Sequence, residues 1–175
     1  MHRRIRHLTP EHVDALAEAG SPWASCVTWQ VDVVRRHALG FSPDSAPARV
    51  AAKRAWVREV LEQWGHCGQV VLVGERPVAV LAYAPPVHVP GVEAFPTAPA
   101  SADAVVLAGL WVAPEQRGAG LARALVQAAA RDLLERGDAR ALEAFAATGG
   151  CDPHDLTPCS PPEALLARLG FETRR

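Results

Sequence analysis

The sequence has almost no lysine, no excess of either charge and no long apolar run. Lys53 is the single lysine among 18 basic residues, and the formal net charge is -1 with a pI of about 6.6. A chain without a basic excess is not expected to have nucleic acid or an anionic membrane as its main partner. Since no run of 18 apolar residues occurs, we also expect no membrane-spanning helix.

Cysteine is scarce and irregularly spaced. The four cysteines, at positions 26, 67, 151 and 159, form no framework typical of small secreted proteins. The basic N-terminal stretch MHRRIRHLTP is not followed by the apolar segment of a signal peptide. We therefore expect free thiols and a cytoplasmic protein.

Two small groups contain residue types that suit zinc. One is Cys151-x-x-His154 with Cys159, and the other is the pair His66-Cys67. Neither is accompanied by a second paired motif, and the two groups are far apart in the sequence. We therefore expect no metal.

The remaining composition suits one folded domain spanning residues 1–175. Hydrophobic residues make up 49% of the chain, enough for a sizeable core without disulfides. A strand is expected in RRIRHL, and a helix after it, with Thr9 as N-cap and Pro10 in the first turn. A longer helix begins near Pro47, and QVVLVGERPVAVLAYAP predicts a hairpin around residues 74–76.

The second half of the chain alternates loops with clearer elements. Residues 85–102 hold five prolines and show no helix or strand pattern, as in a lid or binding loop. A fourth strand, residues 104–112, should stop before Pro114. A helix from Leu121 to Gly137 follows, because its leucines recur at helical spacing. A strand in ARALEAFAA, a helix in EALLARLG and the start of a last strand in FETRR complete the prediction.

The connection between the fourth strand and this helix is Arg117-Gly118-Ala119-Gly120-Leu121-Ala122. Unpaired amides in a first helical turn bind phosphate, and glycine lets a ligand approach them. Arg117 and Arg123 can add charge-assisted bonds. The Walker P-loop is excluded because its lysine is missing, and a dinucleotide fingerprint lacks its third glycine. An ordinary strand–turn–helix corner stays open for this hexapeptide alone.

More of the chain resembles the GNAT family of N-acetyltransferases. Arg117, Gly120 and Ala122 match its motif Arg/Gln-x-x-Gly-x-Gly/Ala, and LWVAPEQ resembles the exit of its fourth strand. IRHLTPEHVDALAEA is similar to its opening strand and helix, and LLARLGFE to its late helix. The resemblance implies an α/β fold of mixed α+β type. Its single domain has a mixed, mostly antiparallel twisted sheet of about six strands, flanked by helices and splayed between the fourth and fifth strands.

The resemblance also implies acetyl-CoA as co-substrate. Its pantetheine arm would lie along Leu110, Trp111 and Val112, where a backbone N–H near Val112 would polarise the acetyl carbonyl. Its pyrophosphate would bind the turn. The cofactor-binding residues there are Arg117, Gly118, Ala119, Gly120, Leu121, Ala122 and Arg123. An amine would attack the thioester directly.

The catalytic acid and base are less clear from the resemblance. Leu166 stands where the family often has an acidic tyrosine, and Cys159 where it often has asparagine. Tyr83, the only tyrosine, is the candidate replacement acid, with a core or rim position as the alternative. Glu143 is the preferred base, since a lone acid in an apolar strand is costly to bury. The other candidates for the base are Asp103, Glu93 and His88.

The acceptor is expected to be a primary amine of a small molecule or a peptide. Trp23 and Trp29 fall where the family often builds its acceptor site, although core packing is the commoner role of such side chains. An acyl-CoA-binding module without turnover is the alternative function, and acyl transfer to aminoacyl-tRNA is disfavoured by the neutral charge. A homodimer is plausible, because few residues follow Phe171 and an exposed sheet edge would favour pairing.

Overall fold

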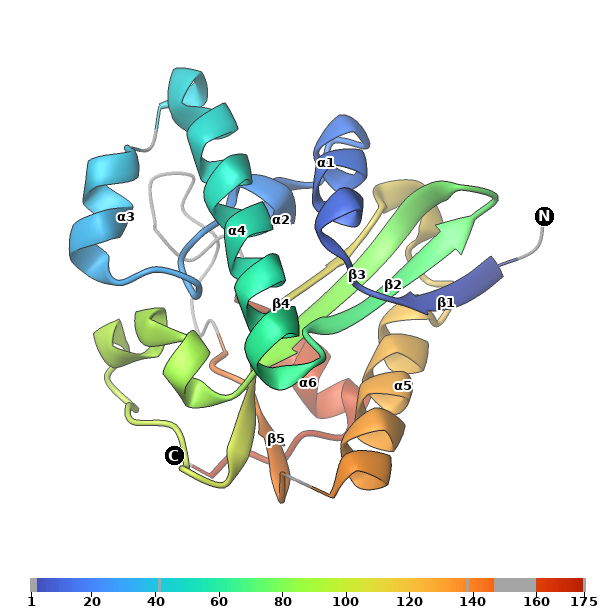
Figure 1. Cartoon of the computed structure of the whole chain (residues 1–175). Coiled ribbons are helices and arrows are strands. Elements are labelled where there is room, and N and C mark those ends of the chain that lie inside the picture. The colour runs from blue at the N-terminus through green and yellow to red at the C-terminus, as the bar shows by residue number, and fades with distance from the viewer. Residues whose placement is uncertain (1–2, 41, 138, 147–159, 175) are drawn as a thin grey trace.

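The computed structural model describes residues 3–40, 42–137, 139–146 and 160–174. One sheet contains the five strands in chain order (Figure 1): β1 (Arg3–His7), β2 (Gly68–Val73), β3 (Arg76–Ala84), β4 (Ala104–Val112) and β5 (Ala141–Glu143). Neighbouring strands are antiparallel except β4 and β5, which are parallel. The predicted mixed, mostly antiparallel sheet is confirmed. It has five strands rather than about six, because residues 171–174 form no strand.

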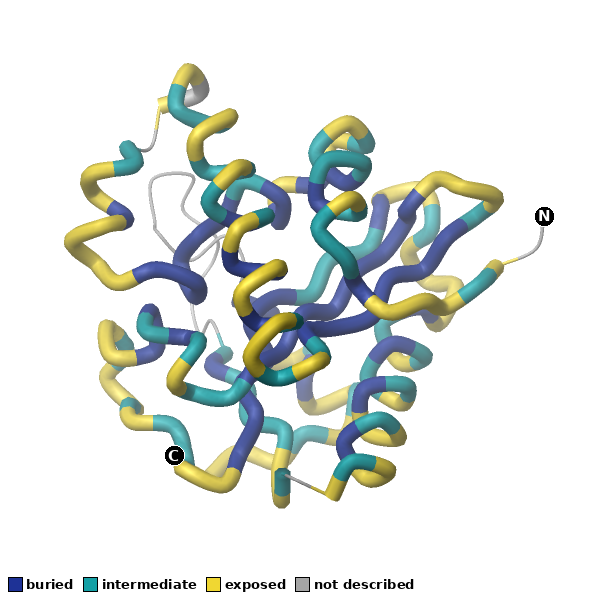
Figure 2. The backbone as a smooth tube through the Cα atoms, in the orientation of Figure 1, coloured by how far each residue is buried: buried dark blue, intermediate teal, exposed yellow. Residues whose placement is uncertain are grey.

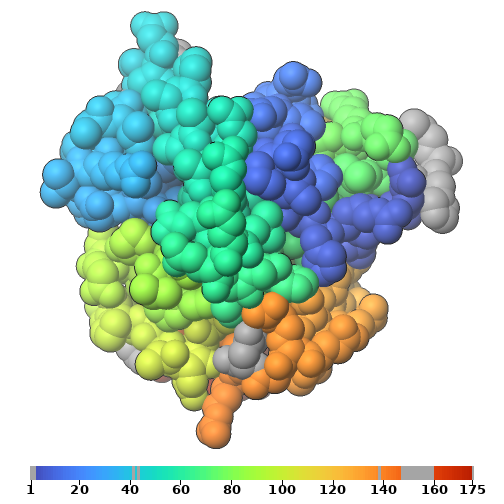
Figure 3. Space-filling view, in the orientation of Figure 1, coloured from blue at the N-terminus to red at the C-terminus, as the bar shows by residue number. Residues whose placement is uncertain are grey.

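Helices cover both faces of this sheet (Figure 1). Helix α4 contacts α1 and α2, and α1 and α2 contact strands β3 and β4, whereas α5 packs on β2, β3 and β4. Figure 3 shows α4 lying across one face between α1 and α3. The α-helices are α1 (Pro10–Glu18), α2 (Pro22–Ser25), α3 (Val33–Leu39), α4 (Ala46–Trp64), α5 (Leu121–Arg136) and α6 (Glu163–Leu169).

The helix limits follow the local signals in the sequence. Thr9 is the N-cap of α1, and Pro10 occupies the first turn, where its missing N–H costs nothing. Gly65 ends α4 and Gly137 ends α5, both with a left-handed backbone that glycine adopts without steric cost. The α5 residues that contact the sheet form the predicted row: Leu121, Leu125, Ala129 and Leu133.

Alternation along the central strands divides the core into two clusters, and Figure 2 shows these strands to be the most buried part of the molecule. On β3, Val80, Ala82 and Ala84 face the cluster beneath α1, α2 and α4. Leu81 and Tyr83 face the opposite cluster beneath α5. Both faces of the central strands are therefore covered, which explains why the hairpin is apolar on both sides.

The proline-rich segment contains short helical turns that its sequence did not predict. The 3-10 helices η2 (Pro86–His88) and η3 (Pro90–Ala94) occupy its first half. The amide of Gly91 donates to the carbonyl of Trp29 at 3.2 Å. The indole of Trp56 donates to the carbonyl of His88 at 2.6 Å. These bonds tie the segment to α4 and to the chain before α3.

The cysteines only partly follow the sequence-based expectation. Cys67 is a free, buried thiol, and burial raises its pKa to about 12. Cys26, in contrast, is disulfide-bonded, so the expectation of a free thiol is wrong at this position. Cys151 and Cys159 lie outside the described residues. In the part of the chain that the structure describes, no helix is both long and apolar enough to cross a bilayer.

Candidate active site

The centre of β4 contains a β-bulge. In the pairing with β3, Ala82 lies opposite Gly109 and Tyr83 opposite Leu107, so Ala108 is the extra residue. Gly109 has a φ of 143°, which L side chains rarely adopt. A Cβ there would collide with the indole of Trp23. A glycine inside an apolar strand is a sequence signal for such a bulge, and Gly109 is that signal in the strand predicted for residues 104–112.

Two side chains from the chain between α1 and α3 hold this bulge in place. Trp23, on α2, covers Gly109 and is 2% exposed. Gln30 is buried, and its Nε2 donates to the carbonyl oxygen of Ala108 at 3.0 Å. Because a carbonyl released by a bulge needs another donor, Gln30 replaces a lost bond of the sheet.

Strands β4 and β5 separate immediately before the bulge. Their pairing joins Ala104 to Ala141 and ends where Val106 meets Glu143. Beyond that point, β4 continues to Val112 with β3 as its strand partner among the described residues. Among the described residues, no strand lies beside β4 along Leu110, Trp111 and Val112 on the side that faces away from β3, and these three residues are only half-buried.

The glycine-bearing turn after β4 is open to solvent. After the short η4 (Pro114–Gln116), the chain reaches Gly118 and Gly120, whose φ values are 77° and 75°. Residues 117–120 are all exposed. A Cβ built on either glycine would meet no atom within 4 Å. The protein's own side chains therefore leave the amide end of α5 accessible, and a helix start of this kind attracts anions.

The two arginines of the turn have different partners. The Nε of Arg117 donates to the carbonyl of Val112 at 3.4 Å, a long bond that leaves the exposed guanidinium beside the turn. Arg123 donates from NH2 to the carbonyl of Arg168 at 2.8 Å. Arg123 thereby links the first turn of α5 to the last turn of α6, a role that the sequence did not reveal.

A cavity of about 600 Å³ lies between α5, β5 and α6. Val126 of α5, Phe145 and Leu166 contribute to its apolar lining, and Ser101 and Glu143 are its polar residues on the β5 side. The residues 110–112 and 117–123 that the sequence singled out do not line it. Leu166, at the position expected to hold an acid, is a buried part of this lining.

Glu143 ends the paired part of β5, and the loop before β4 holds its carboxylate. Oε2 accepts the backbone N–H of Ser101 at 3.0 Å, and Oε1 accepts the Ser101 hydroxyl. The residue is half-buried. These bonds explain how a carboxylate is kept in an apolar strand, and they join the proline-rich segment to the fifth strand.

Tyr83 lies on the α5 side of the sheet and is fully buried. Its hydroxyl donates to Oδ2 of Asp132 at 2.5 Å. Burial first, and then the hydrogen bond to Asp132, raise the pKa of Tyr83 far above its ordinary value. The structure thus places Tyr83 against α5, whereas Glu143 lies at β5, and the two catalytic candidates are not brought together.

The remaining candidates are dispersed. Trp29 is fully buried, and it stacks on Phe95 with ring centroids 4.6 Å apart, which links it to the proline-rich segment. Glu93 and Asp103 are exposed, and His88 is half-buried in η2. The sequence-predicted group of Cys151, His154 and Cys159 lies outside the described residues.

Comparison with known proteins places this geometry in a family. The model of the Acetyltransferase (GNAT) family matches residues 31–151. No curated protein matches the chain closely enough in sequence to count as a relative.

Solved structures share the fold at low identity. The aminoglycoside N-acetyltransferase AAC(6')-Iy in complex with CoA is 19% identical, with 99% of this chain and 90% of that chain covered and a TM-score of 0.56. AAC(6')-Ih from Acinetobacter baumannii is 16% identical, with 99% of this chain and 94% of that chain covered and a TM-score of 0.57. Ribosomal-protein-alanine N-acetyltransferase from Brucella melitensis biovar Abortus 2308 is 14% identical, with 100% of this chain and 95% of that chain covered and a TM-score of 0.57. Since the family model covers more than half of the sequence, the chain belongs to the GNAT acetyltransferase family.

Proposed function

We propose that the protein is an acetyl-CoA-dependent N-acetyltransferase that moves the acetyl group to a primary amine. The observation that carries the proposal is the exposed glycine turn at the start of α5, directly after a bulged strand that separates from its parallel neighbour. The turn provides amides for a pyrophosphate, and the separated strand provides a wall for the pantetheine arm.

The residues of this chain would act as follows. The amides of residues 117–122 bind the pyrophosphate, and the exposed guanidinium of Arg117 adds charge. Leu110, Trp111 and Val112 line the arm, so that a backbone N–H near Val112 donates to the acetyl oxygen as it becomes an oxyanion. The amine nitrogen forms its bond to the acetyl carbon, and the carbon–sulfur bond then breaks to release CoA thiolate.

The acid step is assigned to solvent. Tyr83 is buried and its hydroxyl donates to Asp132, so we assign it to holding Asp132 rather than to protonating the thiolate. Leu166 has no proton to give. The thiolate of CoA would then leave as an anion and take its proton from water.

Glu143 stays the proposed base. An alkylamine with a pKa of about 10.4 is neutral in only about one part in 2,500 at pH 7, so a base that removes its proton speeds the reaction. Glu143 is a half-buried carboxylate at the point where β4 and β5 separate. Its bonds to Ser101 support a second role, which is to fix the proline-rich segment.

The proposed acceptor is the amine of a small molecule or of a peptide. Proteins with the same fold are named for both kinds of acceptor, aminoglycosides and a ribosomal-protein alanine. Trp23 and Trp29 are too deeply buried to contact an acceptor, so more exposed elements near the site would bind it. We place the acceptor between the proline-rich segment, β5 and α6, where a cavity already borders Glu143.

Binding of CoA to the turn is tested with a pair of charge variants on one helix. Ala119→Glu puts a carboxylate on the exposed turn, where it competes with the pyrophosphate for the same amides. We expect titration calorimetry to show at least a tenfold loss of CoA affinity. Gln127→Glu is the matched control, because it adds the same charge to an exposed position further along α5. Equal affinities for the two variants would overturn the turn assignment.

Turnover is tested by mixing the protein with acetyl-CoA, a panel of amines and peptides, and a thiol reagent that reports free CoA. Release of CoA that depends on one amine class supports the enzyme. The alternative is an acyl-CoA-binding module without turnover. It is favoured by the hydrogen-bonded Tyr83 and the apolar Leu166 at the expected acid position. Tight CoA binding without release over the whole panel would establish it.

The base is tested by the pH dependence of Glu143→Gln. If Glu143 removes the amine proton, turnover falls more at pH 7 than at pH 9, where more of the amine is already neutral. Ser101→Ala is the matched control, since it removes the hydroxyl bond but keeps the carboxylate. A loss of the same size at both pH values, shared by Ser101→Ala, would show that Glu143 acts by holding the loop.

A further inference from the structure

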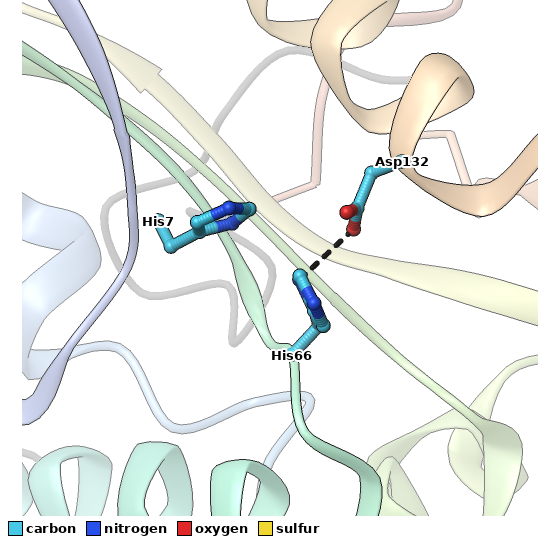
Figure 4. A group of neighbouring side chains, drawn as sticks. All are labelled: His7, His66 and Asp132. Carbon is cyan, nitrogen blue, oxygen red and sulfur yellow. Dashed lines mark ion pairs between the residues drawn. The ribbon is translucent and has the colours of Figure 1, made fainter. Parts of the chain in front are cut away.

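We propose that His7, His66 and Asp132 form a binding site for a divalent transition-metal ion of the zinc type. The three residues come from elements far apart in the sequence. His7 is the last residue of β1, His66 lies between α4 and β2, and Asp132 is in the fourth turn of α5. Figure 4 shows the three side chains converging from these elements.

The ligand atoms are close enough for one ion. Each residue offers one ligand atom, and the three atoms lie within 4.8 Å of one another. The Nδ1 of His66 is 3.1 Å from Oδ2 of Asp132. Two ligand atoms that each lie about 2.0–2.1 Å from a tetrahedral zinc ion are roughly 3.3–3.4 Å apart, so this pair needs to move apart only slightly to reach that spacing.

The third ligand can complete the site at little cost. The rings of His7 and His66 meet edge to face, with centroids 4.7 Å apart and an angle of 83° between their planes. His7 is exposed, so a small rotation of its ring moves a nitrogen closer without disturbing the core. Its exposure also provides the path by which an ion enters and leaves room for water as a fourth ligand.

The residues around Asp132 hold its carboxylate in one orientation, as is usual for the ligands of a metal ion. The Tyr83 hydroxyl donates to Oδ2 of Asp132 at 2.5 Å. Asp132 and His66 have side chains that are only 11% and 23% exposed. Partners behind the ligands that orient them in this way are a regular part of metal sites, and their loss typically weakens binding about 10–100-fold.

The donor set selects the kind of ion. Two imidazoles with one carboxylate suit zinc and its neighbours, whereas calcium and magnesium prefer oxygen ligands alone. Two arginines are close to Asp132 along α5. Arg131 is the preceding residue and is exposed, and Arg136, one turn further, donates to the carbonyl of Trp64 at 2.8 Å while lying over the Trp64 ring.

The ion would act as a structural link and not as part of acetyl transfer. Asp132 is 12 residues beyond Gly120, which is about 18 Å along a helix, so the site is distant from the glycine turn. A bound ion would join the end of β1, the residue pair before β2, and α5. An ion that binds only the folded state raises its stability by mass action.

The test is zinc titration of tag-free protein that has been treated with a chelator. We expect calorimetry to show one ion per chain, and the melting temperature to rise by about 5 °C or more with zinc in excess. Magnesium is expected to cause no shift. His7→Ala and Asp132→Asn should each weaken zinc binding at least tenfold. His7→Ala changes an exposed side chain and should fold normally.

Two controls make the result decisive. His37→Ala removes another exposed histidine, on α3, and should bind zinc as the unaltered protein does. His154→Ala tests the competing sequence motif near Cys151. Zinc binding that persists in His7→Ala and Asp132→Asn but is lost in His154→Ala would overturn the proposal. So would the absence of stoichiometric binding, which would leave His66 and Asp132 as a plain ion pair.

Discussion

Each face of the sheet buries a polar cluster, and the two clusters differ in their hydrogen bonding. Beneath α5, the Tyr83 hydroxyl donates to Asp132, which also pairs with His66. Beneath α1, α2 and α4, the amine of Lys53 and the indole N–H of Trp23 have no hydrogen-bond partner among the described residues. Lys53 is fully buried, and its Nζ lies 4.4 Å from the centre of the Trp23 ring.

The network of Tyr83, Asp132 and His66 therefore stabilises the fold, whereas the unpaired groups of Lys53 and Trp23 lower its stability. A buried donor without an acceptor costs about 1–3 kcal/mol, whereas a paired one contributes a little. Burial lowers the pKa of Lys53 well below its ordinary value, because the charged amine is penalised where water is excluded. The costly face is the one that holds the bulge at Gly109, next to the proposed acetyl site.

The largest effect is expected from breaking the network beneath α5. Asp132→Ala removes the hydrogen-bond acceptor of the Tyr83 hydroxyl and the ion-pair partner of His66. Both polar groups then lack this partner where the protein largely excludes water. We expect the free energy of unfolding to fall by about 3 kcal/mol, measured by urea denaturation in the presence of a chelator.

Glu135→Ala provides the control for that change. It removes an exposed carboxylate from the same turn of α5 and should alter stability by less than about 0.5 kcal/mol. If Asp132→Ala were equally mild, the network would contribute little, and the two faces would not differ as we describe.

A smaller effect of opposite sign is expected on the other face. Lys53→Met replaces a buried amine by an apolar chain of similar size and should stabilise the protein at pH 7 by about 1–2 kcal/mol. The advantage should shrink as the pH rises. Between the lowered folded pKa and the unfolded value of about 10.4, only the unfolded state binds this proton, so the stability of the unaltered protein increases with pH.

Arg54→Met is the matched control for Lys53→Met. Arg54 is the next residue, and its ion pair with Asp14 at 2.8 Å is about half exposed. Its loss should destabilise the protein by less than about 1 kcal/mol, without the pH trend. A destabilised Lys53→Met variant would mean that the amine has a favourable role in the fold.

The smallest effect is expected at the bulge. Gln30→Ala leaves the carbonyl of Ala108 without its donor and should cost about 1 kcal/mol of stability, measured by thermal denaturation. Because the bulge shapes β4, CoA affinity should fall as well, whereas Gln127→Ala on exposed α5 should change neither. Unchanged CoA affinity in Gln30→Ala would mean that the bulge keeps its shape without this support.

Local signals predicted most of the fold, and long-range contacts account for what they missed. Pro10, Gly65 and Gly137 mark helix limits through backbone conformation, which a sequence reveals directly. The helical turns of the proline-rich segment depend on bonds to Trp29 and Trp56, which are distant in the chain. A strand was expected to begin in FETRR, but residues 171–174 pair with no neighbouring strand of the described sheet.

The site was predicted in the same uneven way. The glycine turn can be recognised in the sequence because the residues that provide its amides, 117–122, are consecutive. The contacts of Glu143 with Ser101, and of Tyr83 with Asp132, join positions 42 and 49 residues apart, so no local pattern reveals them. The group of His7, His66 and Asp132 is hidden for the same reason, since its members become neighbours only when the sheet and α5 have packed.

The fit between Trp23 and Gly109 limits how this protein can be altered. The segment before α3 supports the proline-rich segment that we propose borders the acceptor, and it shares one interlocking contact with the strand proposed to deliver the thioester, so neither is an independent module. A chimera that takes residues 21–30 from another family member must bring a matching residue for position 109. Transplanting specificity would therefore require the two segments to be exchanged as a unit.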